Sequence, residues 1–163
     1  MKNLLFIAML ASASLVYSQA FTGKGDNKFQ IGLNLQDNAT GINAAYDFGV
    51  GDNISFGFVG TYALGVNESI DADFGDRIDV RARFNANIGN VLDIDPNFDF
   101  YPGLSFGLKN FGGHIGARYF FSNGFGIYSE IGTPIARYDT GTLTPAEKIH
   151  NQFYFNFGAV FNL

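Results

Sequence analysis

The last eleven residues of the chain, 153–163, alternate without interruption between two kinds of side chain. One parity carries Phe153, Phe155, Phe157, Ala159, Phe161 and Leu163, and the other carries Tyr154, Asn156, Gly158, Val160 and Asn162. A period of two is that of a β-strand with one apolar face and one polar or small face. The same pattern recurs along most of the chain, so the sequence predicts an all-β protein.

Eight segments show this alternation, and short runs rich in Gly, Asn, Asp and Ser separate several of them. The segments are 28–36, 41–49, 54–64, 77–88, 98–109, 114–121, 125–135 and 148 or 149 to 163. We predict tight turns at 50–53 and 122–124. Each segment has about the length that a tilted strand needs to cross a membrane.

The apolar face of every segment lacks charged residues, whereas the opposite face is polar or small. The polar set is Lys28, Gln30, Asn34, Asn43, Asp47, Arg77, Asp79, Arg81, Arg83, Asn85, Asn87, Asp99, Arg118, Glu130 and Asn156. The interior of an eight-stranded barrel is only just wide enough to be filled by side chains, so roughly thirty large apolar groups do not fit there. We therefore expect the apolar face to point outward into lipid, and inward glycines to leave room for Arg side chains, Tyr101, Tyr128 and Tyr154. The predicted fold is a closed antiparallel eight-stranded up-and-down transmembrane β-barrel.

The first twenty residues have the composition of a cleaved export signal. Lys2 provides a positive start, residues 4–10 form a short apolar run, and small residues follow at 11–14. Ser18 and Ala20 fit the small-x-small rule, which predicts Phe21 as the first mature residue; cleavage after Ser18 fits nearly as well. We therefore expect a signal peptide at 1–20, a barrel domain at 21–163, export through the secretory pathway and a location in the bacterial outer membrane.

The amino-acid composition argues against several kinds of anchor, cross-link and partner. There is no Cys, so neither a lipoprotein anchor nor a disulfide framework is expected. Acidic residues outnumber basic ones by 15 to 10, which argues against nucleic acid as a partner. The aromatic residues are Phe and Tyr, with no Trp.

With its export signal, its eight alternating segments and the strand at 153–163, the chain resembles the OmpA/OmpX-type family of small outer-membrane barrels. The resemblance implies contact with outer-membrane lipid and recognition of the last strand by the barrel-assembly machinery. The chain departs from the family in ending at Leu163 where Phe is usual, and Tyr46, Tyr62 and Tyr119 must serve in the aromatic girdle. The family's roles include membrane structure, surface interaction and slow solute passage, and we expect a monomer.

The inward charges are the first candidate site. Arg81 and Arg83 lie beside Asp79 on one segment, and Arg118 is predicted to face Glu130 across the turn at 122–124. We interpret these groups as paired charges that fill the lumen. The alternative is a charged constriction in a narrow pore.

The other candidates are weaker. The acidic run 67–76 has oxygen ligands at alternate positions but not in the order of an EF-hand, so we interpret it as a solvated loop rather than a calcium site. His114 and His150 are expected near the outer rim, with no motif of a metal site. Ser55 and Ser129 lack a nucleophile-elbow motif. We therefore predict no catalytic residue, no metal and no cofactor.

Segment lengths assign the loops to two sides. The long polar loops 65–76 and 136–147 and the short ones at 37–40 and 110–113 are predicted on the outer side, and 89–97 is long for the inner side. The expected function is a non-enzymatic outer-membrane protein that is structural or interacts through its outer loops. The alternatives are a small-solute channel and, less favoured, a membrane-embedded enzyme.

Overall fold

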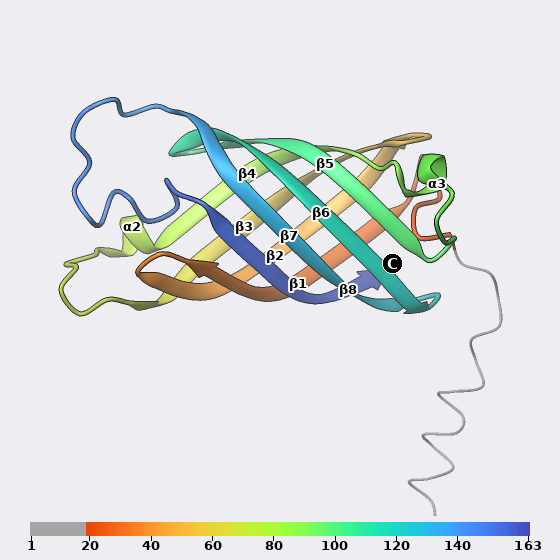
Figure 1. The fold of residues 1–163 in the computed structure, drawn as a ribbon, viewed down its shortest axis with the longest axis horizontal. Coiled ribbons are helices and arrows are strands. Elements are labelled where there is room, and N and C mark those ends of the chain that lie inside the picture. The colour runs from red at the N-terminus through yellow and green to blue at the C-terminus, as the bar shows by residue number, and fades with distance from the viewer. Residues whose placement is uncertain (1–18) are drawn as a thin grey trace, which may run out of the picture.

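A computed structural model describes residues 19–163, and it consists of eight antiparallel strands in a closed ring (Figure 1). Each strand pairs with its neighbours in the sequence, and β1 pairs with β8 to close the ring. The strands are β1 (Asn27–Gln36), β2 (Ala39–Gly51), β3 (Ile54–Val66), β4 (Ile78–Ala86), β5 (Phe98–Gly107), β6 (Asn110–Ser122), β7 (Phe125–Arg137) and β8 (Tyr154–Asn162). The prediction of an all-β ring of eight antiparallel strands is confirmed. The predicted signal peptide lies outside the described residues except for Gln19 and Ala20.

Among the predicted strand boundaries that differ from the structure, those of β6 and β8 are informative. Residues 110–113, expected as a loop, form the beginning of β6, because Asn110 pairs with Arg137 of β7. Residues 148–153, expected as the start of the last strand, belong instead to the connection before β8. In this connection the apolar Ile149 is buried against Ala39 and Ala63. Its apolar side chain therefore serves a loop contact, although in the sequence it resembles part of a strand.

Two short helices interrupt the connections on either side of β4. Helix α2 (Phe74–Arg77) precedes it and α3 (Gly89–Leu92) follows it. Arg77, predicted as the start of the fourth strand, is thus the last residue of α2, and its guanidinium Nε donates to the carbonyl of Ala72. None of the helices among residues 19–163 is long and apolar enough to span a membrane.

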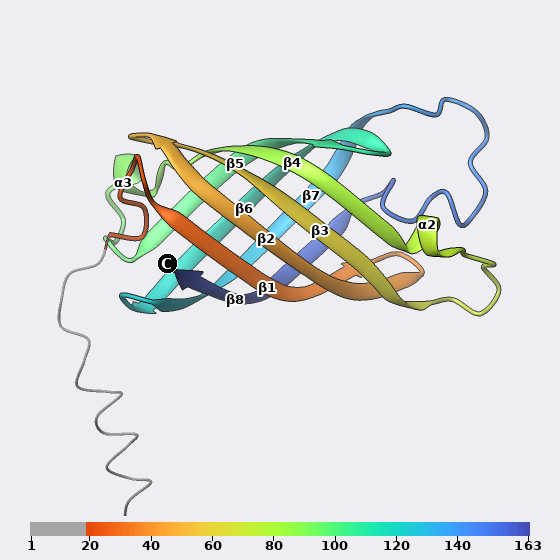
Figure 2. The same ribbon diagram turned by 180° about the vertical axis from the view of Figure 1, so that it is seen from behind.

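The two ends of the barrel differ. The C-terminus, the first described residues and α3 lie at one end, which we call the terminal end (Figures 1 and 2). The long connections 67–77 and 138–153 lie at the opposite end, which we call the loop end. The predicted separation of the long loops from the C-terminus and from the start of the described chain is therefore present.

The two faces of the wall have opposite polarity, as the alternation predicts. Fourteen of the fifteen predicted polar side chains are buried inside the ring, and Arg77 is the exception. Outward, large apolar side chains are exposed along every strand, among them Leu33, Phe58, Ile115 and Ile131. The core of this protein is therefore its polar lumen, and its apolar surface is its exterior.

Candidate functional site

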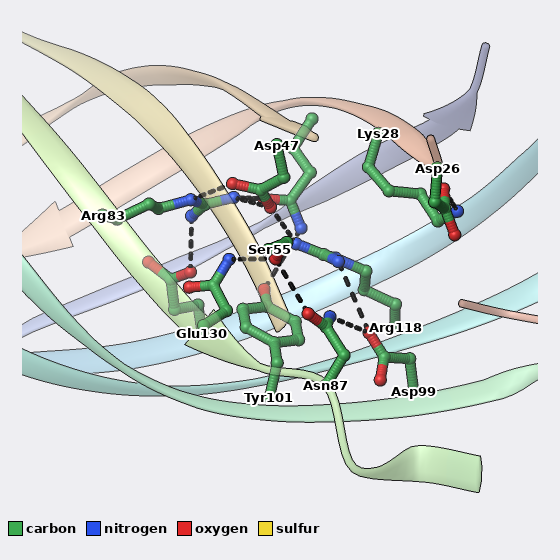
Figure 3. A network of polar contacts seen from close by, with 12 residues as sticks. Asp26, Lys28, Asp47, Ser55, Arg83, Asn87, Asp99, Tyr101, Arg118 and Glu130 are labelled. Carbon is green, nitrogen blue, oxygen red and sulfur yellow. Dashed lines mark hydrogen bonds and ion pairs between the residues drawn. The ribbon is translucent and has the colours of Figure 1, made fainter. Parts of the chain in front are cut away.

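The centre of the lumen is organised around Arg83 of β4 (Figure 3). Its guanidinium donates to both carboxylate oxygens of Asp47 on β2, with Nε to Oδ1 at 2.6 Å and Nη2 to Oδ2 at 2.5 Å. The same guanidinium donates from Nη1 to Oε2 of Glu130 on β7 at 2.9 Å. Its Nη2 also donates to Oε1 of Gln30 on β1 at 2.6 Å. One side chain thus ties together four strands, and the two-pronged contact with Asp47 is the strongest geometry for such a pair.

Arg118 of β6 extends the network toward the terminal end. It forms ion pairs with Asp47 and with Asp99 of β5, the latter with 3.4 Å between Nη1 and Oδ2. Its guanidinium carbon lies 4.0 Å from the ring centroid of Tyr101, a cation–π distance. Asp99 also accepts a hydrogen bond of 2.8 Å from Nδ2 of Asn87. Because all these groups are nearly inaccessible, each charge depends on its partners rather than on water.

The predicted pairing of Arg118 with Glu130 is wrong. In the ladder between β6 and β7, Tyr128 stands opposite Arg118, and Gly116 stands opposite Glu130. A register shift between Phe120 and Ser122 accompanies this offset. Both side chains point inward as predicted, but Arg118 pairs with Asp47 of β2 and Asp99 of β5. Glu130 pairs instead with Arg83 of β4.

The predicted contact of Arg81 with Asp79 is present, and it lies in the lumen next to the loop end. The two groups form a buried ion pair, and the Arg81 guanidinium lies 5.0 Å from the ring centroid of Tyr154. Nη2 of Arg81 also donates to the carbonyl oxygen of His150 at 3.2 Å. The pair therefore connects the lumen to the long connection above it.

That connection folds back over the loop end and forms a cap, which we define as residues 146–151. His150 is its centre: its backbone N–H donates to Oε1 of Gln36, and its Nε2–H donates to the carbonyl of Arg77, both at 2.9 Å. Its Nδ1 accepts from Nε2 of Gln36 at 3.1 Å, and its carbonyl accepts from Nδ2 of Asn110 at 2.9 Å. Burial, which disfavours the imidazolium, lowers the pKa of His150 to about 4. The cap is therefore held by a neutral histidine that contacts four other elements of the fold.

The two histidines do not share a site. His114, expected near the rim, points into the lumen from β6, and its Nε2–H donates to Oδ1 of Asn85 at 2.7 Å. His150, which we expect near the outer rim, lies at the loop end and is buried in the cap. Within residues 19–163, no three His, Asp or Glu side chains are grouped so that they could hold a metal ion.

The lumen tyrosines occupy space that glycines leave open, as the alternation predicts. A Cβ added at Gly116 of β6 would collide with the ring of Tyr101, its direct neighbour on β5. A Cβ at Gly132 would collide in the same way with the ring of Tyr154. Tyr128 reaches across the lumen, and its hydroxyl donates to Oδ1 of Asn43 at 2.9 Å. Aromatic rings thus replace missing side chains and fill the interior.

The acidic run at 67–76 forms local contacts. The side chain of Asn67 accepts hydrogen bonds from the backbone and the hydroxyl of Ser69, at 3.0 and 2.7 Å. Asp76 accepts from the backbone of Asp73 at the start of α2, at 3.1 Å. Glu68, Asp71 and Asp73 are exposed. The geometry is that of a solvated loop with a capped helical turn.

The sequence alone does not reveal the role of Asn110, which the predicted boundaries place in a loop. Its side-chain amide donates to the carbonyl of His150 and to Oδ1 of Asn151, and so holds the cap to β6. Because both partners lie about forty residues away, no local pattern carries the signal.

Comparison with known proteins gives a family and a fold. A family model described as a family of unknown function (DUF6646) matches residues 11–163. No curated protein matches the sequence. Among solved structures, a chain described as "De novo design of transmembrane beta-barrels" is similar, with a TM-score of 0.55 and 10% sequence identity, over 87% of this chain and 98% of that one. At that identity the likeness concerns the fold alone, a closed ring of eight strands similar to a designed transmembrane barrel.

Proposed function

Because this chain belongs to the DUF6646 family, whose function is unknown, we propose its function from its geometry: it is an integral β-barrel protein of the bacterial outer membrane, with a closed lumen. It works without enzymatic chemistry, as a structural or surface-interaction protein of the same kind as the small OmpA/OmpX-type barrels. The single observation that carries this proposal is the inverted distribution of polarity, with charged residues buried inside and large apolar residues exposed outside.

The exterior supports the membrane location. Phe58, Ile115 and Ile131 are 53%, 46% and 42% exposed, although each lies well inside its strand. A contiguous apolar surface of this kind is unfavourable in water but is what lipid requires. Closure of the ring gives the backbone groups hydrogen-bond partners from strand to strand, which is the other requirement of a structure that crosses lipid. Barrel-assembly machinery that reads the last strand would insert the protein as a monomer.

The interior supports a closed lumen rather than a channel. Arg81, Arg83 and Arg118 are at most 6% exposed, and each is paired with a carboxylate. Tyr101 and Tyr154 fill the space between them. The cap covers the loop end through His150. The parts left to meet a partner are the exposed residues of the connections 67–77 and 138–153, at the loop end.

Insertion into lipid is tested by placing the same charge inside and outside the apolar band. Phe58→Arg puts a cation on the outward face of β3 and should cost up to about 2–4 kcal/mol in a bilayer, depending on depth. Phe74→Arg is the matched control, because Phe74 is 68% exposed on α2, beyond the strands. Heat-modifiable gel mobility after refolding into phosphatidylcholine vesicles measures the folded fraction. Folding of the Phe58 variant at the level of the control, in lipid, would contradict the membrane location.

The role of the loops is tested by shortening the exposed part of each without touching the cap. Residues 139–142 and 67–69 are replaced by short Gly-Ser turns, which leaves Ala146–Asn151, α2 and Ile70, which packs against the cluster around Ile149, in place. The barrel should fold as before, and cells should lose adhesion, phage adsorption or another surface phenotype that the intact protein confers. A phenotype that survives both replacements would exclude the loops as the interacting surface.

A further inference from the structure

The first described residues are packed into the terminal end of the barrel. Ala20 is 3% exposed, and its side chain lies in one apolar cluster with Phe120, Tyr128 and Val160. Its backbone N–H donates to the carbonyl of Pro96 at 2.7 Å. These partners belong to β6, β7, β8 and the connection after α3, so Ala20 packs between three strands and a connection at this end.

The residues that follow Ala20 are also packed and hydrogen-bonded at this end of the barrel. Phe21 is 5% exposed, and the backbone N–H of Thr22 donates to Oδ2 of Asp26 at 2.7 Å. Asp26 in turn forms a buried ion pair with Lys28 of β1. Asp26 and Gly49 are also joined through their backbones, with a hydrogen bond of 2.7 Å from the Gly49 N–H. We call residues 19–26 the N-terminal plug.

The plug distinguishes between the two cleavage positions that the sequence allows. We infer that the export signal is cut between Ser18 and Gln19, so that the mature chain begins at Gln19 and keeps the whole plug; this inference rests on the proposed export to the outer membrane. Cleavage at this point leaves the new α-ammonium group on Gln19, which is exposed. Gln19 lines a cavity together with Asp93, Asp95 and Asp99, so the positive charge enters an acidic surrounding.

Cleavage after Ala20 would disturb the folded structure in three ways. It removes the side chain that fills the space between Phe120 and Val160, and it leaves the Pro96 carbonyl without its donor. It also places the α-ammonium group on Phe21, a residue that is 5% exposed. Removing water from around this charge would lower the stability of the folded state. A chain that begins at Gln19 avoids all three effects.

The test uses the chain 1–163, expressed in a Gram-negative host and purified from the membrane fraction. Intact mass spectrometry identifies the first residue, and the expected mature chain is 19–163, with or without loss of ammonia from Gln19. A chain of 21–163 from the same fraction would overturn the inference while leaving export intact. A membrane-free chain that retains Met1 would contradict the proposed export itself.

A second measurement tests the plug without the signal peptidase. Chains that begin at Ser18, Gln19 and Phe21 are refolded in the same detergent and unfolded with guanidinium. The first two should have equal midpoints, because both keep Ala20 and its apolar cluster, and the third should unfold at a lower guanidinium concentration. Equal midpoints for all three would show that the plug does not select the cleavage position.

Discussion

Asp47 and Arg83 form the most complete ion pair of the lumen although β3 lies between their strands. In the ladders on either side, Gly57 of β3 stands directly opposite both residues. A Cβ at Gly57 would collide with Oδ1 of Asp47 and with the backbone of Tyr46. The absence of a side chain at this point lets the carboxylate and the guanidinium meet over β3.

Gly57→Ala should therefore destabilise the barrel by about 1–3 kcal/mol, the usual cost of forcing a methyl group into a filled interior. Gly60→Ala, three residues along the same strand, is the control, because a Cβ there meets nothing within 4 Å. Urea unfolding in detergent measures both variants. A loss at Gly57 no larger than at Gly60 would show that the space between Asp47 and Arg83 is not constrained.

Removal of one member of the central pair should be costly. Asp47→Ala and Arg83→Ala each leave a buried charge without its main partner, and we expect losses of about 3–5 kcal/mol. The double variant should lose clearly less than the two single losses combined. A control cycle combines Arg83→Ala with Asp52→Ala, whose carboxylate is exposed on the turn after β2, and should be additive within about 0.5 kcal/mol. Additivity in both cycles would refute the coupling.

Acid should loosen the cap. Because burial lowers the pKa of His150 from 6.5 to about 4, the folded cap binds fewer protons than the open one between these values. The stability of the cap is thus complete above about pH 6.5 and falls as the pH drops toward 4. Protonation of Nδ1 would also abolish its hydrogen bond from Gln36, while Asp79 favours the proton and Lys109 and Arg81 oppose it.

Hydrogen exchange of the peptide that contains 146–151 measures this effect, after correction for the intrinsic pH dependence. Protection should fall on the order of 100-fold between pH 7 and pH 4, as a shift of this size implies. His150→Gln removes the titrating group and should make the protection independent of pH in this range. A wild-type profile that matches the variant would rule out His150 as the acid-sensitive contact.

Purified protein should give no large, reproducible conductance steps in planar bilayers at neutral pH. An eight-stranded ring holds little more than its own side chains, and here Arg81, Arg83, Arg118, Tyr101 and Tyr154 occupy that space. Stable steps of uniform size would favour the small-solute channel. Heat-modifiable gel mobility of the same preparation is the control. It shows that a lack of conductance comes from a closed barrel and not from a misfolded protein.

The sequence by itself predicts the faces of the wall with few errors. Alternation assigns Asp47, Arg83 and Arg118 to the inside and Phe58 to the outside, because the side-chain period of a strand is a local property of its backbone. The glycines that accommodate Tyr101 and Tyr154 follow from the same parity. Errors arise where an apolar residue fits the alternation for another reason. Ile149 is an example, because it is buried in the cap and does not belong to β8.

Only the tertiary structure decides which charges from different strands meet, whereas Asp79 and Arg81 are neighbours on one strand. Arg118 pairs with Asp47, 71 positions away, and Glu130 pairs with Arg83, 47 positions away, although Arg118 and Glu130 lie on adjacent strands. Parity fixes the side of the wall on which a group lies, but closure of the ring determines which strands face one another, and register shifts displace neighbours along the ladder. A buried charge takes the partner that this geometry brings within reach, because water is not available to replace it.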